Sequence, residues 1–138
     1  MIFMSNSSEY CSVAFHSSLT VEHNNKIERI QKTSLKVILS EMYVDYPSAL
    51  EMTGLDSLSA RRVKKCLNFS LKCLKHERNQ KLFPLNPNAG MFNVRNSEVF
   101  TVNFAGSSTY RDCAIPFCQR LLNNHFPDKK AYLRFMTN

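Results

Sequence analysis

Apolar residues recur at intervals of three and four through the first half of the chain, which is the period of an amphipathic helix. The pattern predicts a first helix over about 20–45, with Ser18 or Thr20 as the residue that caps its N-terminus. The apolar side of this helix consists of Ile27, Ile30, Ser34, Leu35, Ile38 and Met42. Glu28 and Lys32 are four residues apart, so we expect them to form an ion pair on the outer side.

Two more helices are predicted before the middle of the chain. A short one is expected over about 48–53, because Pro47 suits a first turn and Gly54 suits the residue after a helix. The strongest pattern begins after Ser57, a capping residue, and extends to about Glu77. Its apolar side consists of Val63, Cys66, Leu67, Ser70, Leu71 and Leu74. This third helix is therefore predicted to be amphipathic.

The second half of the chain has a weaker pattern. Two prolines end the helical period, and residues 84–112 are predicted to be irregular and poorly packed. Within them, alternation of apolar and polar residues over 100–104 favours one short extended segment. A last helix is predicted over about 115–124, and the polar, basic tail after Phe126 is expected to be frayed.

These elements predict the fold class and the organisation of the chain. We expect a mainly α fold with about three main helices, a short connecting helix and at most one short strand. The 138 residues are expected to form an N-terminal leader (1–17), a helical region with the basic helix (18–83), an irregular connector (84–112), and a C-terminal helix with its tail (113–138).

Charge changes this picture, because the formal net charge is +7 and one segment carries all of it. Eight basic residues lie in this segment: Arg61, Arg62, Lys64, Lys65, Lys72, Lys75, Arg78 and Lys81. Only Glu77 opposes them, whereas the rest of the chain has ten basic and ten acidic residues. Concentrated positive charge attracts polyanions, so these eight are the candidate nucleic-acid-binding residues. Because the charge extends to the end of the helix, backbone contact is favoured over base readout.

The sequence offers no comparable candidate for catalysis. A polymerase or nuclease needs clustered carboxylates to hold Mg²⁺, and no two acidic residues here lie within three positions of each other. We therefore predict no catalytic residue, no cofactor and no small-molecule substrate. Cys66, Cys73 and His76 could supply three ligands of a zinc site, but no Cys-x-x-Cys pair supports it, so no metal is expected.

The cysteines also bear on the compartment. Their number is odd, at five, and no secretory signal or apolar run of membrane-spanning length accompanies them. We expect free thiols and an intracellular protein, nuclear or cytoplasmic, that is not secreted and has no membrane partner.

Several stretches, taken in order, carry a resemblance to a known family. They are residues 16–20 (HSSLT), 27–39 (IERIQKTSLKVIL), 46 (Y), 49–50 (AL), 54–58 (GLDSL), 61–62 (RR), 66–69 (CLNF), 72–75 (KCLK), 82–85 (LFPL), 95–96 (RN), 114–117 (AIPF) and 119–123 (QRLLN). Over about residues 9–124, the chain resembles the C-terminal region of polyproteins encoded by jockey-like non-LTR (LINE-type) retrotransposons. That region follows the reverse transcriptase palm, whose Asp-Asp turn has no counterpart here.

The resemblance implies a function without catalysis. It implies a truncated remnant of an RNA-directed DNA polymerase, in which a thumb-side helical segment holds template and primer. The expected partners are then RNA or DNA backbone, bound without sequence preference, and the upstream polymerase domains. The alternative is a helical protein-interaction module with no role in nucleic-acid binding, in which the third helix docks its apolar face on a partner.

Overall fold

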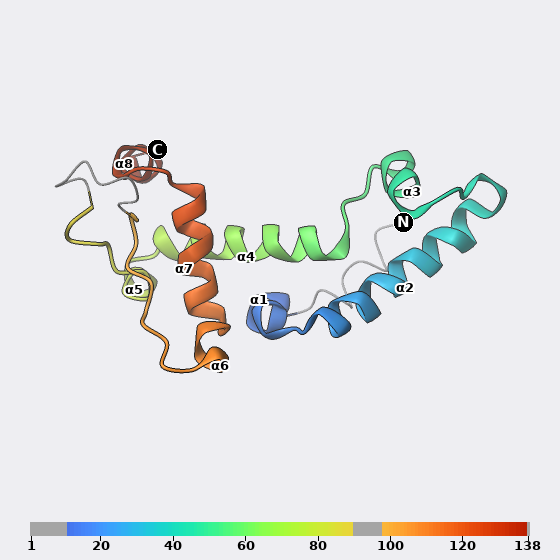
Figure 1. The fold of residues 1–138 in the computed structure, drawn as a ribbon. Helices are drawn as coiled ribbons and strands as arrows, with labels where there is room; N and C mark the ends of the chain where they lie inside the picture. Colours follow the sequence, from blue (N-terminus) through green and yellow to red (C-terminus); the bar gives the residue numbers. More distant parts are fainter. Residues whose placement is uncertain (1–10, 90–97, 138) are drawn as a thin grey trace. The chain divides into compact units, whose positions relative to one another are not determined.

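The computed structural model describes residues 11–89 and 98–137, and its mainly helical architecture confirms the predicted fold class (Figure 1). Its helices are α1 (Ser12–Phe15), α2 (Val21–Leu39), α3 (Tyr46–Thr53), α4 (Leu58–Leu74), α5 (Glu77–Gln80), α6 (Ser108–Arg111), α7 (Ala114–His125) and α8 (Lys129–Thr137), with the 3-10 turns η1 (His16–Ser18) and η2 (Ser40–Met42). Residues 1–10 of the predicted leader and 90–97 of the predicted connector lie outside the described residues.

The chain divides into two compact units, unit 1 (Met1–Lys65) and unit 2 (Cys66–Asn138). The boundary falls inside α4, so the first turns of this helix belong to unit 1 and its last turns to unit 2. The four segments predicted from the sequence divide the chain at other places, because they follow changes of pattern rather than packing.

In unit 1 the start of α2 and both ends of α3 lie at capping, proline and glycine residues that the sequence pattern indicated. The hydroxyl of Thr20 accepts a hydrogen bond from the backbone N–H of His23 and caps α2, as one of the two predicted capping residues. Pro47 lies in the first turn of α3, and Gly54 ends that helix in the left-handed conformation (φ 63°). Helix α2 ends at Leu39, earlier than predicted, and continues as the 3-10 turn η2.

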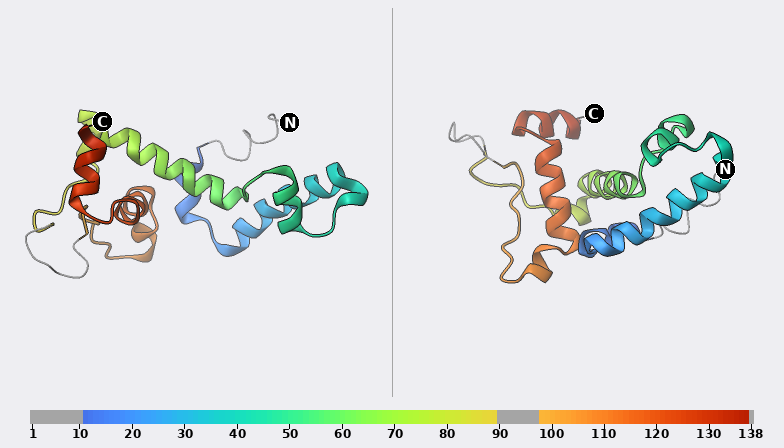
Figure 2. Two further views of the ribbon diagram at one scale, coloured as in Figure 1. Left: turned by 90° about the horizontal axis from the view of Figure 1, so that it is seen from above. Right: turned by 45° about the vertical axis from the view of Figure 1, so that its right-hand side comes forward.

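Polar side chains of α2 hold the segments that follow it within unit 1. The Glu28 carboxylate accepts hydrogen bonds from the Tyr46 hydroxyl (2.6 Å) and from the backbone N–H of Leu58 (3.2 Å). Gln31 donates to the carbonyl of Asp56 (3.2 Å). The predicted outer-face ion pair of Glu28 with Lys32 is therefore wrong, because an orphan N–H at the start of α4 and a half-buried phenol take up this carboxylate. Figure 2 shows α3 beside α2, as these contacts require.

Unit 2 contains the larger share of the buried apolar residues. Five of its side chains are at least 96% buried, namely Phe83, Val99, Phe100, Leu122 and Phe126. The expectation of a poorly packed connector over 84–112 is therefore wrong around Val99 and Phe100, which lie in the core, whereas Phe104 is 92% exposed. The short extended segment predicted over 100–104 is met at Phe100, which forms an isolated antiparallel bridge with Leu85.

Two side-chain amides of α7 explain why this connector packs. Asn123 accepts from the backbone N–H of Phe100 (2.8 Å) and donates to its carbonyl (3.0 Å). The fully buried Gln119 accepts from the N–H of Asn103 (2.9 Å) and donates to the carbonyl of Leu82 (2.9 Å). Helix α7 itself matches the helix predicted over 115–124.

The tail after Phe126 was predicted to be frayed, and this prediction is wrong, because residues Lys129–Thr137 form α8. Its Tyr132 is buried against Phe100 and Phe126, with ring centroids 5.3 and 5.7 Å apart. Burial of a large aromatic ring stabilises a short helix that its own propensity would leave marginal.

Candidate nucleic-acid interface

Six of the eight candidate cations are exposed, and they belong to different units. Lys64 and Lys65 lie in the unit 1 part of α4, whereas four cations lie close together in the sequence of unit 2. Those four are Lys72, Lys75, Arg78 and Lys81. The other two candidates, Arg61 and Arg62, have different surroundings.

Arg62 is a core residue of unit 1, with none of its surface exposed. Its Nη2 donates to Oδ1 of Asn24 on α2 (2.8 Å), and its Nε donates to Nδ1 of His16 (3.4 Å). A guanidinium that is buried and bonded in this way cannot reach a phosphate, so Arg62 is removed from the candidate set. The helical period could have indicated this, because Arg62 lies four residues after the buried Leu58 and four before the buried Cys66.

Arg61 is half-buried and lies near the phenol of Tyr46. Burial and the hydrogen bond to Glu28 raise the pKa of Tyr46, and the positive charge of Arg61 acts in the opposite direction. Arg61 therefore contributes to the packing of unit 1, and only part of its side chain is available to a ligand.

Once Arg62 is removed, the positive charge is concentrated in unit 2. This unit has ten basic and four acidic residues in its sequence, a net charge of +6, whereas unit 1 has eight basic and seven acidic residues. Unit 1 also uses the charge of Arg62 internally. The field that would attract a polyanion therefore comes mainly from unit 2.

The four cations of unit 2 lie where α4 gives way to α5. Helix α4 ends at Leu74, whose carbonyl accepts a hydrogen bond from Nε2 of Gln80 (2.7 Å), and the buried Phe83 anchors the chain that follows. The Nζ of Lys75 lies 4.9 Å from the ring centroid of Phe135 on α8. This local fold exposes the cations while the chain between them is held by buried side chains.

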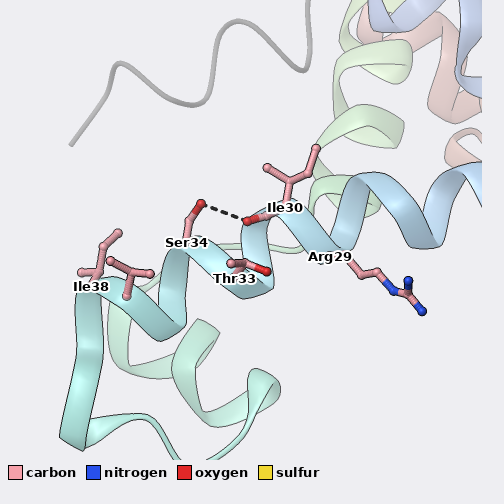
Figure 3. Close-up of a pocket in the computed structure, with 6 residues that line it drawn as sticks. Arg29, Ile30, Thr33, Ser34 and Ile38 are labelled. Carbon is pink, nitrogen blue, oxygen red and sulfur yellow. Dashed lines mark hydrogen bonds between the residues drawn. The ribbon is translucent and has the colours of Figure 1, made fainter.

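A second surface feature lies in unit 1, on the side of α2 that does not pack. A shallow groove of about 540 Å³ is lined by Arg29, Ile30, Thr33, Ser34, Val37 and Ile38 (Figure 3). Ile30 and Val37 are 60% and 76% exposed, and the hydroxyl of Ser34 donates to the carbonyl of Ile30 (2.9 Å) rather than outward. The described lining is therefore largely apolar.

The cysteines form no recognisable metal site. Cys66, Cys73 and Cys118 are buried and Cys11 and Cys113 are exposed, all as free thiols. Across residues 11–89 and 98–137, no group of three or more His, Cys, Asp or Glu residues is arranged to hold a metal ion. Cys66, Cys73 and His76 all lie in this described part of the chain and do not form such a group.

No protein-family model, curated protein or solved structure matches this chain. Among the described helices, none is long and apolar enough to cross a membrane.

Proposed function

We propose that this chain binds the phosphate backbone of RNA or DNA, without sequence preference and without catalysing a reaction. The observation that carries the proposal is the set of four exposed cations of unit 2, Lys72, Lys75, Arg78 and Lys81, which only Glu77 interrupts. Lys64 and Lys65 are the further exposed candidates, and Arg61 contributes in part.

The physical basis is the release of counterions from the nucleic acid. Each phosphate that a Lys or Arg neutralises frees condensed cations, so affinity falls steeply as salt rises. Side chains that contact phosphates do not distinguish bases, because the backbone carries no sequence information. The four cations lie at the end of α4 and beyond it, whereas a recognition helix reads bases with its first turns.

The resemblance to the retrotransposon polyproteins supports the same proposal. It suggests that the chain derives from an RNA-directed DNA polymerase polyprotein, as a region that follows the palm and holds nucleic acid. We expect the chain alone to lack polymerase and nuclease activity, because its carboxylates are dispersed. Extension of a primed template in the presence of Mg²⁺, at a rate above that of heat-inactivated protein, would contradict this expectation.

The binding proposal is tested by two fourfold variants of matched charge. Lys72, Lys75, Arg78 and Lys81 are changed to Gln in one variant, and Lys26, Arg29, Lys32 and Lys36 in the other. Each set has three lysines and one arginine, all exposed, and the second set lies on α2. Fluorescence anisotropy measures the affinity for a labelled RNA–DNA hybrid and for its single strands over a range of salt.

We expect the unit 2 variant to reduce the slope of log affinity against log salt on the duplex by about 3. The α2 variant should change the slope much less, because its cations lie in the nearly neutral unit. Equal effects of the two variants, or parent protein that binds no nucleic acid, would reject the proposal. The variant Lys64→Gln/Lys65→Gln then measures the contribution of the first half of α4.

The apolar groove on α2 supports a second candidate function, a protein-interaction module. The docking face would be that of α2 and not that of α4, because Leu58, Cys66, Cys73 and Leu74 of α4 are already buried in this chain. Such an interaction should persist at about 1 M salt, where the Debye length is about 3 Å. Ile30→Ser/Val37→Ser should abolish it and leave nucleic-acid binding unchanged.

A further inference from the structure

Helix α8 adds basic residues to unit 2 that were expected to lie in a frayed tail. Three of its nine residues are cations, Lys129, Lys130 and Arg134, and none is acidic. Asp128 precedes the helix, and its carboxylate accepts a hydrogen bond from the backbone N–H of Ala131 (2.7 Å), as an N-terminal cap does. A cation on an ordered helix can hold one phosphate in place at a lower entropic cost than a cation on a frayed tail.

Aromatic contacts hold α8 to Phe100 and Phe126, and one cation–π contact joins it to the residue that follows α4. Phe135 packs on Phe126, with ring centroids 5.4 Å apart, and Tyr132 packs on Phe100 and Phe126. On its other side, Phe135 lies under the ammonium of Lys75 (4.9 Å). The left view of Figure 2 shows α8 beside the C-terminal end of α4. The end of α4 and α8 are therefore neighbours, although the cations of the two basic segments are 48 or more residues apart in the sequence.

Two of the three cations of α8 lie on the side of the helix opposite to the buried Tyr132. Lys130 and Arg134 are four residues apart and lie on one face, and each is two positions from the buried Tyr132, which places them on the opposite side of the helix. Arg134 directly precedes Phe135, so its Cα lies about 3.8 Å from that of Phe135. The side chain of Arg134 leaves α8 about 100° around the helix from that of Phe135, which the ammonium of Lys75 covers.

Arg134 lies in the last turn of α8, where the helix dipole favours a cation, but helix stability does not explain the position of the two lysines. Lys129 and Lys130 lie in the first turn of α8, where the positive end of the helix dipole disfavours cations. Without these three cations the rest of unit 2 has seven basic and four acidic residues, a net charge of +3, so it repels the cations of α8. A bound polyanion would offset both the repulsion between the lysines and the positive end of the helix and the repulsion among the cations of unit 2.

We propose that α8 is the second part of the phosphate-binding surface, with Lys130 and Arg134 contacting the backbone beside the cations at the end of α4. This inference rests on the proposed function and extends the site to residues far away in the sequence. The ligand is a nucleic-acid strand or duplex long enough to reach both segments.

The test uses the full chain and two double variants that match in composition. Lys130→Gln/Arg134→Gln removes one lysine and one arginine from α8, and Arg29→Gln/Lys32→Gln removes the same pair from the exposed side of α2. Gln is a good helix former, and circular dichroism verifies that both variants keep their helix content. Anisotropy with a labelled RNA–DNA hybrid of about 20 base pairs gives affinity and salt slope.

We expect the α8 variant to bind about tenfold more weakly at low salt and to lose about 1 to 2 units of salt slope. The α2 variant should stay within about twofold of the parent. If the α8 variant behaves like the α2 variant while the fourfold unit 2 variant loses slope, the role of α8 is rejected and the proposed function stands. If the parent does not bind the hybrid, both are rejected.

A membrane surface is the other source of closely spaced phosphates, and the same variants separate it. Vesicles that contain phosphatidylserine are added as a competitor at matched total charge. We expect unlabelled hybrid to displace the labelled hybrid from the protein, and we expect the vesicles not to displace it. Tight vesicle binding that the α8 variant loses, with unchanged binding to the hybrid, would overturn the nucleic-acid assignment of α8.

Discussion

Asn123 on α7 pairs with both backbone groups of Phe100, since its Oδ1 accepts from the N–H (2.8 Å) and its Nδ2 donates to the carbonyl (3.0 Å). A side-chain amide thus does for Phe100 what a neighbouring strand does in a sheet. Because Phe100 has no exposed surface and contacts Phe126 and Tyr132, this pairing connects α7 to the aromatic core on which α8 packs.

Asn123→Ala should therefore destabilise unit 2 by about 2 kcal/mol, because two backbone groups of a buried residue lose their partner. Asn124→Ala is the control, since Asn124 is exposed on the next position of the same helix. Urea unfolding followed by circular dichroism measures the change, and hydrogen exchange of the Phe100 amide should accelerate only in Asn123→Ala. Equal exchange rates in the two variants would contradict the pairing.

The pairing of Asn123 with Phe100 is an example of a contact that the sequence pattern could not predict. Helices α2, α3, α4 and α7 could be predicted because their apolar spacing, caps, proline and glycine are local signals. The packed connector and α8 could not, since they depend on Asn123, Gln119 and an aromatic cluster, whose partners are distant in sequence. Propensity and period contain no information about such contacts.

The candidate site was predictable to a similar degree. Net charge and its position along the chain identify the cations at the end of α4, because formal charge does not depend on folding. Burial does depend on it, so Arg62 was predicted to be a phosphate ligand although it is enclosed by His16 and Asn24. The contribution of α8 was missed for the same reason, since its order depends on the burial of Tyr132.

Arg62 and Lys64 should accordingly separate stability from binding. Arg62→Ala should destabilise unit 1 by about 2 kcal/mol or more, because it leaves a cavity and deprives Asn24 and His16 of a charged donor. Lys64→Ala, at an exposed position of the same helix, should change stability by less than about 0.5 kcal/mol. Thermal unfolding measures both variants.

The binding assay should give the complementary result. Below the melting temperature of Arg62→Ala, its salt slope for nucleic acid should equal that of the parent, because the buried guanidinium contacts no phosphate. A reduced slope in Arg62→Ala, with the helix content of the parent, would restore Arg62 to the interface.

Stability of unit 1 should depend on pH through His16. Burial, and then the positive charge of Arg62, lower the pKa of His16 from its usual 6.5. The unfolded chain therefore takes up a proton near pH 6.5 while the folded chain still excludes it, so the unfolded state binds more protons. Stability is complete above about pH 6.5 and falls as the pH drops below it, until the folded pKa is reached.

His16→Gln provides the control for this prediction, because Gln has a side-chain oxygen to accept from Arg62 but does not titrate. Melting temperatures measured from pH 8 to pH 5 should fall more steeply for the parent than for His16→Gln. Parallel pH profiles for the two proteins would show that His16 is not responsible for the acid sensitivity.

The five thiols should divide into two reactive and three protected groups. Cys11 and Cys113 are exposed, whereas Cys66, Cys73 and Cys118 are buried. Burial raises the pKa of Cys73 and of Cys118, which lowers the fraction of thiolate, the form that reacts with disulfide reagents. Titration of the native protein with Ellman's reagent should thus show two fast thiols, and the remaining three should react only after denaturation.

The variant Cys11→Ser/Cys113→Ser makes this prediction specific to named residues. It should lose the fast phase completely and keep three thiols that appear in denaturant, with the helix content of the parent. Five fast thiols in the native parent would mean that α4 and α7 do not bury Cys66, Cys73 and Cys118 as described. Metal analysis of the same samples tests the alternative of a zinc site. One tightly held zinc ion per chain would protect the ligating thiols by coordination rather than by burial. A chelator would then expose these thiols without denaturant.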